Sequence, residues 1–185
     1  LTKIVATTPA IMHLIDAGVL DLETPVAKIL PGFKSSMQPT LTIRHLLNHS
    51  SGLPAYLPLF EELIEMRQKE QGPALGSESI DWAIERIAYL QREPPEKQCV
   101  YSDLGFILLG RIVEIVAGQD LDRFCLEQIF LPLGMEDTFF LPLSDDALRK
   151  ERLKGRQVVA TEQCPWRKRL IRGEVHDDNC HSFGG

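Results

Sequence analysis

The clearest hydrophobic pattern lies near the start of the chain. Ile11, Leu14, Ile15 and Gly18 follow the i, i+3, i+4, i+7 spacing of one helix face. Glycine commonly ends a helix, and proline is tolerated near its beginning, where it can introduce a kink. We therefore expect a helix that passes through Pro9 and stops at Gly18.

Further helices are expected along the first three quarters of the chain. Thr42 is a suitable N-cap for a short helix over 43–48, which ends at the turn Ser51-Gly52-Leu53-Pro54. A long apolar helix is expected to begin at Asp103 and to close at Gly118. The other predicted helices cover residues 25–30, 58–70, 79–91 and 121–130.

The pattern weakens towards the end. Residues 157–161 and 171–175 are the candidate strands, which are too few for a sheet of their own. We expect a mainly α chain: a helical domain over 1–143, and a loop-rich tail with short strands over 144–185 that belongs to the same domain.

Composition narrows the class of protein. A hydrophobic content of 44% is enough for a buried core in 185 residues. The net charge of -6 argues against a nucleic-acid partner. Residues 149–172 are locally basic, with nine Lys or Arg against Glu151 and Glu162, and a solvated surface segment is favoured there over a polyanion site.

Neither a zinc finger nor a membrane span is indicated. The cysteines at 99, 125, 164 and 180 form no C-x-x-C pair, and their spacing is compatible with free thiols or with disulfides. The most apolar run, 106–118, is interrupted by Arg111 and Glu114 and is shorter than the roughly 20 residues that a spanning helix needs.

Two short segments could carry chemistry. Lys3 alone is an ordinary lysine near a terminus, but a serine immediately before Leu1 would complete a Ser-x-x-Lys pair on one helix face. In Tyr101-Ser102-Asp103, Ser102 or Asp103 could simply cap the following helix. Alternatively, the loop presents Tyr101 as a general base, which requires a cationic neighbour such as a lysine.

Taken together, the segments resemble the β-lactamase-related family of serine hydrolases, which includes class C β-lactamases, D-alanyl-D-alanine carboxypeptidases and similar esterases. Five segments carry the resemblance in order: Leu1-Thr2-Lys3, 45–54, Tyr101-Ser102-Asp103-Leu104-Gly105, 132–138 and 173–179. The resemblance implies that the chain is the helical domain of an α/β fold, in which helices pack on an antiparallel sheet. Most of that sheet is expected to lie outside the chain.

The same resemblance assigns roles to individual positions. It implies that Lys3 and Tyr101 are catalytic and that Asp103 binds substrate, whereas the stretch from His49 to Pro54 is expected to be a structural turn. The family usually has asparagine at the position of Asp103, and an ionised aspartate can accept but not donate a hydrogen bond. This departure puts efficient β-lactam hydrolysis in doubt and favours an ester or another acyl substrate.

We therefore expect a fragment of a serine acyl hydrolase that acts on an amide, an ester or a β-lactam and needs no cofactor. Leu1 in place of Met and the Gly184-Gly185 ending lead us to expect missing material at both ends. Without the serine and the family's third motif, the fragment should be inactive, and its uncovered apolar face could lead to self-association. Family members are often exported, but the compartment of this chain stays open.

Two alternatives remain. The chain could be a non-catalytic binding or scaffold domain that retains the helical body of the family. The run from His176 to His181 contains two histidines, two carboxylates and a thiol, so metal-dependent hydrolysis is a third possibility. Its spacing fits neither a helix face nor a strand face, and we favour surface hydrogen bonding without a metal.

Overall fold

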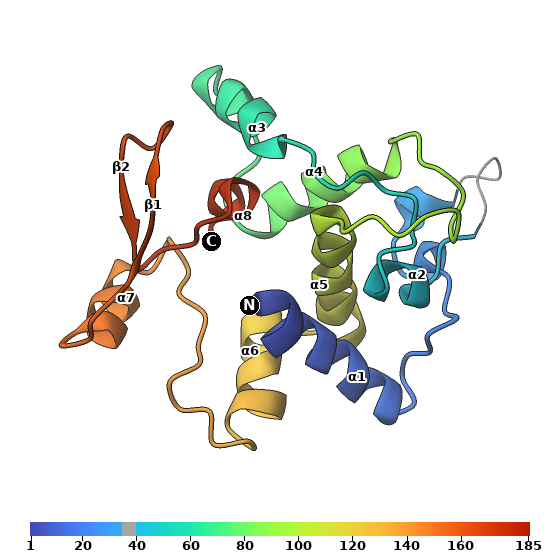
Figure 1. Cartoon of the computed structure of the whole chain (residues 1–185), viewed down its shortest axis with the longest axis horizontal. Helices are drawn as coiled ribbons and strands as arrows, with labels where there is room; N and C mark the ends of the chain where they lie inside the picture. Colours follow the sequence, from blue (N-terminus) through green and yellow to red (C-terminus); the bar gives the residue numbers. More distant parts are fainter. Residues whose placement is uncertain (35–39) are drawn as a thin grey trace. The chain divides into compact units, whose positions relative to one another are not determined.

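A computed structural model describes residues 1–34 and 40–185 of the chain (Figure 1). Its elements, in order, are η1 (Lys3–Thr7), α1 (Thr8–Asp16), η2 (Val26–Lys28), η3 (Pro31–Phe33), α2 (Ile43–Leu47), α3 (Leu59–Gln68), α4 (Ser77–Ala88), α5 (Asp103–Ala117), α6 (Leu121–Cys125), η4 (Leu126–Phe130), α7 (Asp146–Leu153), β1 (Ala160–Cys164), β2 (Arg169–Arg172) and α8 (Asp178–Phe183). The predicted fold class is confirmed, because the described residues form many helices and one sheet of two strands.

The chain divides into two compact units, which are described separately. Unit 1 consists of Leu1–Leu57 and Ile84–Phe139, and unit 2 of Pro58–Ala83 and Phe140–Gly185. Unit 1 therefore contains the first helix, the long apolar helix and all three residues to which the sequence assigns a role. Unit 2 contains the basic stretch and the segment from His176 to His181.

Helix α5 is the centre of unit 1. Its buried residues recur on one stripe, as the helical period requires, and they are Leu104, Leu108, Leu109, Ile112 and Val113. Elements η1, α1, α2 and α6 all pack against this helix. Gly118 ends it in the left-handed conformation at φ 67°, as the sequence predicts.

The first helix starts with a π turn. Elements η1 and α1 form one continuous helical run in which the N–H of Thr8 donates to the carbonyl of Lys3, five residues back. Pro9 has no N–H to donate, so the wider turn occurs where an ordinary i−4 bond would be lost. The helix ends before Gly18, whose φ is 71°, and both predictions about its course are confirmed.

Helix α2 leads into a turn that is hydrogen-bonded to a distant segment of unit 1. Thr42 caps α2 through a reciprocal arrangement with His45, as the sequence suggests. In the turn that follows, the Ser50 and Gly52 carbonyls accept the N–H groups of Glu96 and Glu93. Further along, the Ala55 carbonyl accepts the N–H of Asp103 at 3.1 Å. The turn and the segment before α5 are therefore aligned by their backbones.

Unit 2 is built around α3, α8 and the β1–β2 hairpin. Helices α3 and α8 pack together, and the buried Asn179 side chain accepts the Phe60 N–H at 2.9 Å. The Arg67 guanidinium donates to the Ser182 carbonyl and to the Ser79 hydroxyl, both at 2.7 Å. These contacts tie the two parts of the sequence that make up this unit.

The tail is more regular than the sequence predicts. The strands pair antiparallel. Strand β1 starts three residues after its predicted start at 157, and β2 starts two residues before its predicted start at 171. The turn between the strands covers residues 165–168, which were predicted to lie in neither strand, and it contains Lys168 at φ 53°. Helices α7 and α8 were not predicted. Each begins at an aspartate, Asp145 or Asp177, whose carboxylate accepts an N–H of the first turn.

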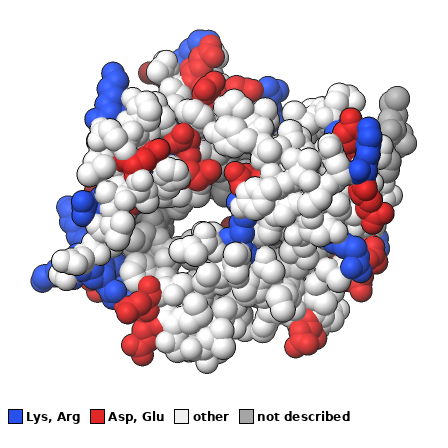
Figure 2. All heavy atoms as spheres, in the orientation of Figure 1, with Lys and Arg blue, Asp and Glu red and all other residues white. Residues whose placement is uncertain are grey.

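The basic residues of 149–172 gather over α7, β1 and β2, at the left of Figure 2. Several are already engaged within unit 2. Arg169 forms a two-pronged ion pair with Glu174, and Arg172 donates to the Val158 carbonyl at 2.5 Å. This pattern agrees with a solvated structural segment.

The four cysteines are free thiols, of which Cys99 is exposed and Cys125 is buried. Burial raises the pKa of the Cys125 thiol to about 11. Among the described helices, none has the length and apolar character needed to cross a bilayer.

Gly52 offers a test of the backbone alignment in unit 1. Its φ is 76°, and an added Cβ would overlap the carbonyl of Glu93. Gly118 has a similar φ of 67° but open space around it. We expect Gly118→Ala to lower the free energy of unfolding by about 1–2 kcal/mol, the usual cost of a left-handed alanine. Gly52→Ala should cost roughly 2–5 kcal/mol, because steric overlap is added.

Urea unfolding of the two variants, followed by circular dichroism, provides the measurement. If both variants lost the same free energy of unfolding, the contact between the turn and the 93–103 segment would not contribute to stability.

Candidate functional site

Lys3 and Asp103 meet in unit 1 although 100 positions separate them in the sequence. The Lys3 Nζ lies 2.5 Å from Asp103 Oδ1. Lys3 begins η1, and Asp103 is the first residue of α5, so the packing of η1 against α5 brings the two side chains together. Both are partly buried, with 28% and 31% of their side chains exposed, and solvent therefore screens this ion pair in part.

Two aromatic rings complete the surroundings of the lysine. Its Nζ lies 5.5 Å from the centroids of both the Tyr101 and the Phe106 rings. At this distance a ring face attracts a cation. The structure thus brings together Lys3, Tyr101 and Asp103, the three residues that the sequence singles out, and adds Phe106, which the sequence reading missed.

Ser102 does not cap α5 in the manner that the simpler interpretation suggests. It occupies the N-cap position, but its hydroxyl donates to the Pro54 carbonyl at 2.7 Å and makes no bond to the helix. Asp103 directs its carboxylate to Lys3. The capping interpretation of these two side chains is therefore wrong. Both of them tie the Tyr101 loop to other parts of unit 1.

His49 also belongs to this group of residues, although the sequence predicts only a structural turn for it. Its ring lies 4.6 Å from the Tyr101 ring and 5.3 Å from the Phe106 ring, centroid to centroid. Its Nδ1 accepts the backbone N–H of Ser102 at 3.1 Å. The prediction placed His49 in a structural turn, and it does lie there, but its side chain faces the same group of residues as Lys3.

The surroundings of His49 favour its neutral form. Burial lowers the pKa of His49 below its ordinary value of 6.5, and the positive charge of Lys3 lowers it further, while Asp103 acts in the opposite direction. A neutral imidazole with Nδ1 as acceptor carries its proton on Nε2. The ring can therefore accept the Ser102 N–H at neutral pH.

The histidines and carboxylates of 176–181 have separate partners in unit 2. His176 Nδ1 lies 3.7 Å from Glu162 Oε1, whereas His181 Nδ1 lies 3.8 Å from Glu174 Oε2. Asp177 caps α8. The side chains of the run therefore do not converge on one point, and each of the three has its own neighbour in unit 2.

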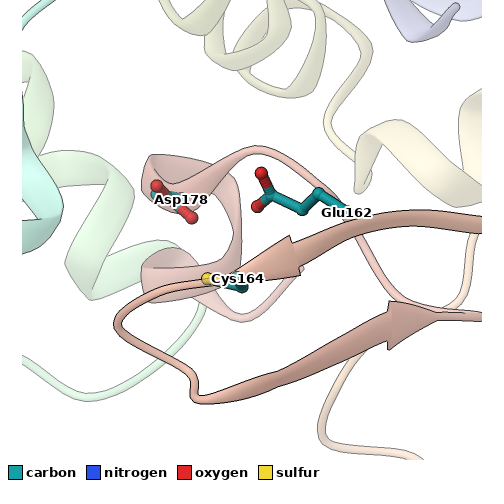
Figure 3. A group of neighbouring side chains, drawn as sticks. All are labelled: Glu162, Cys164 and Asp178. Atoms are coloured by element: carbon teal, nitrogen blue, oxygen red, sulfur yellow. The ribbon is translucent and has the colours of Figure 1, made fainter.

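One group of side chains in the described part of unit 2 does have metal-ligand spacing. Glu162, Cys164 and Asp178 place one ligand atom each within 4.8 Å of one another (Figure 3). Arg167 donates to Asp178 Oδ1 at 2.6 Å, and its backbone N–H contacts the Cys164 sulfur at 3.5 Å. The Arg167 guanidinium thus already pairs with one of the two carboxylates of this group.

A family model described as Beta-lactamase matches residues 1–172 of the chain. An Escherichia coli (strain K12) protein named "Putative D-alanyl-D-alanine carboxypeptidase" is 35% identical over 204 residues, which cover 100% of this chain and 44% of the relative. An N-acetylmuramyl-L-alanine amidase from Bacillus subtilis (strain 168) is 31% identical, with 96% of this chain and 41% of the relative covered.

Among solved structures, the octameric penicillin-binding protein homologue from Pyrococcus abyssi is 27% identical with a TM-score of 0.61. The likeness covers 92% of this chain and 37% of that one. The chain therefore spans less than half the length of these relatives, which agrees with the expectation that it is the helical part of a larger fold.

The ion pair of Lys3 can be tested by chemical labelling. Asp103→Asn removes the charge that favours the ammonium form of Lys3, and only a neutral amine attacks an acylating reagent. We expect Lys3 to be acetylated about two to five times faster in the variant, the range that corresponds to roughly 0.5–1 kcal/mol. Peptide mass spectrometry after brief acetylation gives the rates.

Lys69 and Lys97 pair with Glu65 and Glu93 on the surface and serve as internal references whose rates should not change. An unchanged rate at Lys3 would mean that the contact with Asp103 does not persist in solution.

Proposed function

Because the chain belongs to the beta-lactamase family, we propose that it is the helical part of a serine acyl hydrolase in which Lys3 and Tyr101 transfer protons and Asp103 lines the substrate site. The nucleophile in this proposal is a serine immediately before Leu1 in the longer protein, because that position completes a Ser-x-x-Lys motif with Lys3. No Ser-x-x-Lys motif occurs within the 185 residues themselves.

The observation that carries the proposal is the convergence of an amine and a phenol from distant parts of the sequence. Lys3 Nζ lies over the Tyr101 ring at 5.5 Å, and the lysine comes from η1 whereas the tyrosine lies in the loop before α5. A serine one helical turn before Lys3 would lie on the same helix face as the lysine. An amine, a phenol and a hydroxyl would then be neighbours.

The proposed reaction is acyl transfer in two steps. Lys3 and Tyr101 take the proton of the serine hydroxyl as its oxygen attacks the substrate carbonyl, and the same pair returns the proton to the leaving group. Water then releases the acyl group by the reverse sequence of proton transfers. The chemistry requires no cofactor, and the substrate class is an amide, an ester or a β-lactam.

Asp103 is the feature that bears on the choice of substrate. A carboxylate cannot donate to a substrate carbonyl, which an asparagine amide can do. Asp103 also contacts Lys3 at 2.5 Å, so its negative charge favours the ammonium form of the lysine. The missing hydrogen-bond donor supports an ester or another acyl substrate over a β-lactam.

The proton-transfer pair is tested in the whole protein. Lys3→Ala and Tyr101→Phe should each lower kcat by about 10²–10⁴-fold, the usual contribution of general acid–base catalysis. Steady-state hydrolysis of a p-nitrophenyl ester measures the loss. Lys69→Ala and Tyr89→Phe change exposed residues of the same types and should retain activity.

The 185-residue chain itself should neither hydrolyse the ester above background nor be acylated by a fluorescent penicillin. Stoichiometric acylation of this chain would refute the assignment of the nucleophile. If the whole protein also resists acylation, the alternative of a non-catalytic scaffold is favoured instead.

The role of Asp103 has a separate readout. In the whole protein, Asp103→Asn should raise β-lactam hydrolysis relative to ester hydrolysis about tenfold, because the new amide can donate one hydrogen bond of roughly 1.4 kcal/mol to the acylamino side-chain carbonyl of a β-lactam, which a simple p-nitrophenyl ester lacks. The ratio of kcat/KM for nitrocefin and for a p-nitrophenyl ester measures this preference. An unchanged ratio would remove Asp103 from substrate selection.

A further inference from the structure

We propose that His49 is a positioning residue that holds Tyr101 in place beside Lys3, through the Ser102 N–H that its ring accepts and through the contact of its ring with the phenol. The inference rests on the proposed roles of Lys3 and Tyr101 and adds a residue for which the sequence predicts only a structural role. It concerns unit 1 alone.

His49 brackets Tyr101 with both its backbone and its side chain. The residue before Tyr101 donates its backbone N–H to the His49 carbonyl at 2.9 Å, and the residue after it donates to His49 Nδ1 at 3.1 Å. A single residue therefore fixes the backbone on both sides of the tyrosine. Such a bracket limits the φ and ψ values that Tyr101 can adopt.

The Tyr101 side chain is largely exposed and needs a neighbour to hold it. Tyr101 has 64% of its surface exposed, so packing in a core does not hold its side chain. The contact with the His49 ring at 4.6 Å restricts the phenol on one face. Ordering a side chain costs conformational entropy, and a catalytic group that is ordered beforehand avoids this cost during the reaction.

The backbone of His49 is strained. Its φ of 60° lies in the left-handed region, which costs a residue with a side chain about 1–2 kcal/mol. In this conformation both the carbonyl and the ring of His49 face the segment that carries Tyr101. Strained backbone of this kind is often found at functional sites. The strain is offset here by the two hydrogen bonds.

The bracket depends on the protonation of one ring. Nδ1 can accept the Ser102 N–H only while His49 is neutral, since a protonated imidazole has no acceptor. The charged and titratable groups that face the ring are Lys3, Asp103 and Tyr101. Because burial and Lys3 lower the pKa of His49, the bracket should persist at neutral pH and be lost only as the pH falls through that lowered pKa.

The first experiment uses the 185-residue chain without any substitution. Long-range ¹H–¹⁵N spectra identify the His49 tautomer, and amide spectra follow the Ser102 N–H as the pH is lowered. We expect the proton on Nε2 at neutral pH, and exchange protection of the Ser102 N–H that is lost as His49 titrates. A proton on Nδ1, or a Ser102 amide that does not respond to the titration, would overturn the inference.

The second experiment separates the ring from its acceptor atom in the whole protein. His49→Phe keeps an aromatic face but has no acceptor, whereas His49→Asn keeps a hydrogen-bond acceptor and tolerates a positive φ. We expect kcat of H49F to fall about tenfold, with KM nearly unchanged, since substrate binding does not involve His49. H49N should retain more of kcat than H49F.

The pH profile provides a readout that a purely structural role would not change. We expect the activity of the wild-type protein to fall at acid pH as His49 is protonated, and this acid limb should be absent in H49N, because an amide does not titrate in this range. His13→Asn changes an exposed histidine of unit 1 that contacts Phe124 and should leave the profile intact. An acid limb that persists in H49N would contradict the proposal.

These experiments keep the two proposals apart. If the whole protein transfers no acyl group, the proposed function fails, and the spectra of the wild-type chain still decide whether His49 holds the loop. If the protein is active and H49F matches the wild type in kcat, only the positioning role fails. Circular dichroism establishes that the variants fold, and the wild-type titration decides the question for any that do not.

Discussion

The anchoring of the Tyr101 loop to one turn is the constraint around which unit 1 is arranged. Helix α2 ends where this turn begins, and α5 begins where the loop ends. The two helices pack against each other, and the backbone bonds from His49, Ser50, Gly52 and Ala55 align everything between them. The packing of α2 against α5 therefore fixes the start of α5, and the start of α5 fixes the positions of Tyr101 and Asp103.

Asp103 contributes both to the fold and to the candidate site. A carboxylate in the first turn of a helix interacts favourably with the positive end of the helix dipole, so aspartate is electrostatically acceptable at this position. Its side chain contacts Lys3 on the first helix. Ser102, the residue that would ordinarily cap α5, instead binds the Pro54 carbonyl. The local sequence resembles a helix cap, yet its side chains stabilise the loop and the ion pair.

The sequence predicts those parts of this structure in which apolar spacing is strong. Helix α5 could be predicted because its stripe from Leu104 to Val113 repeats with the helical period. The strands were shifted because β1 is mostly polar, and α7 was missed because none of its residues is buried. Lys3 and Tyr101 could be joined only by resemblance to a family, since no spacing indicates a contact across about a hundred residues. The role of His49 depends on a left-handed backbone, for which a histidine in the sequence is only a weak signal.

The charges around Lys3 favour a site that holds one cation at a time. Asp103 and two aromatic faces surround the ammonium, while the positive charge of Lys3 lowers the pKa of His49. Because such coupling is reciprocal, a proton on His49 would in turn disfavour the charged form of Lys3. Protonation of the histidine would thus weaken the bracket around Tyr101 and place a second positive charge near the Lys3 ammonium. The surroundings of His49 therefore favour a neutral imidazole beside the ion-paired lysine.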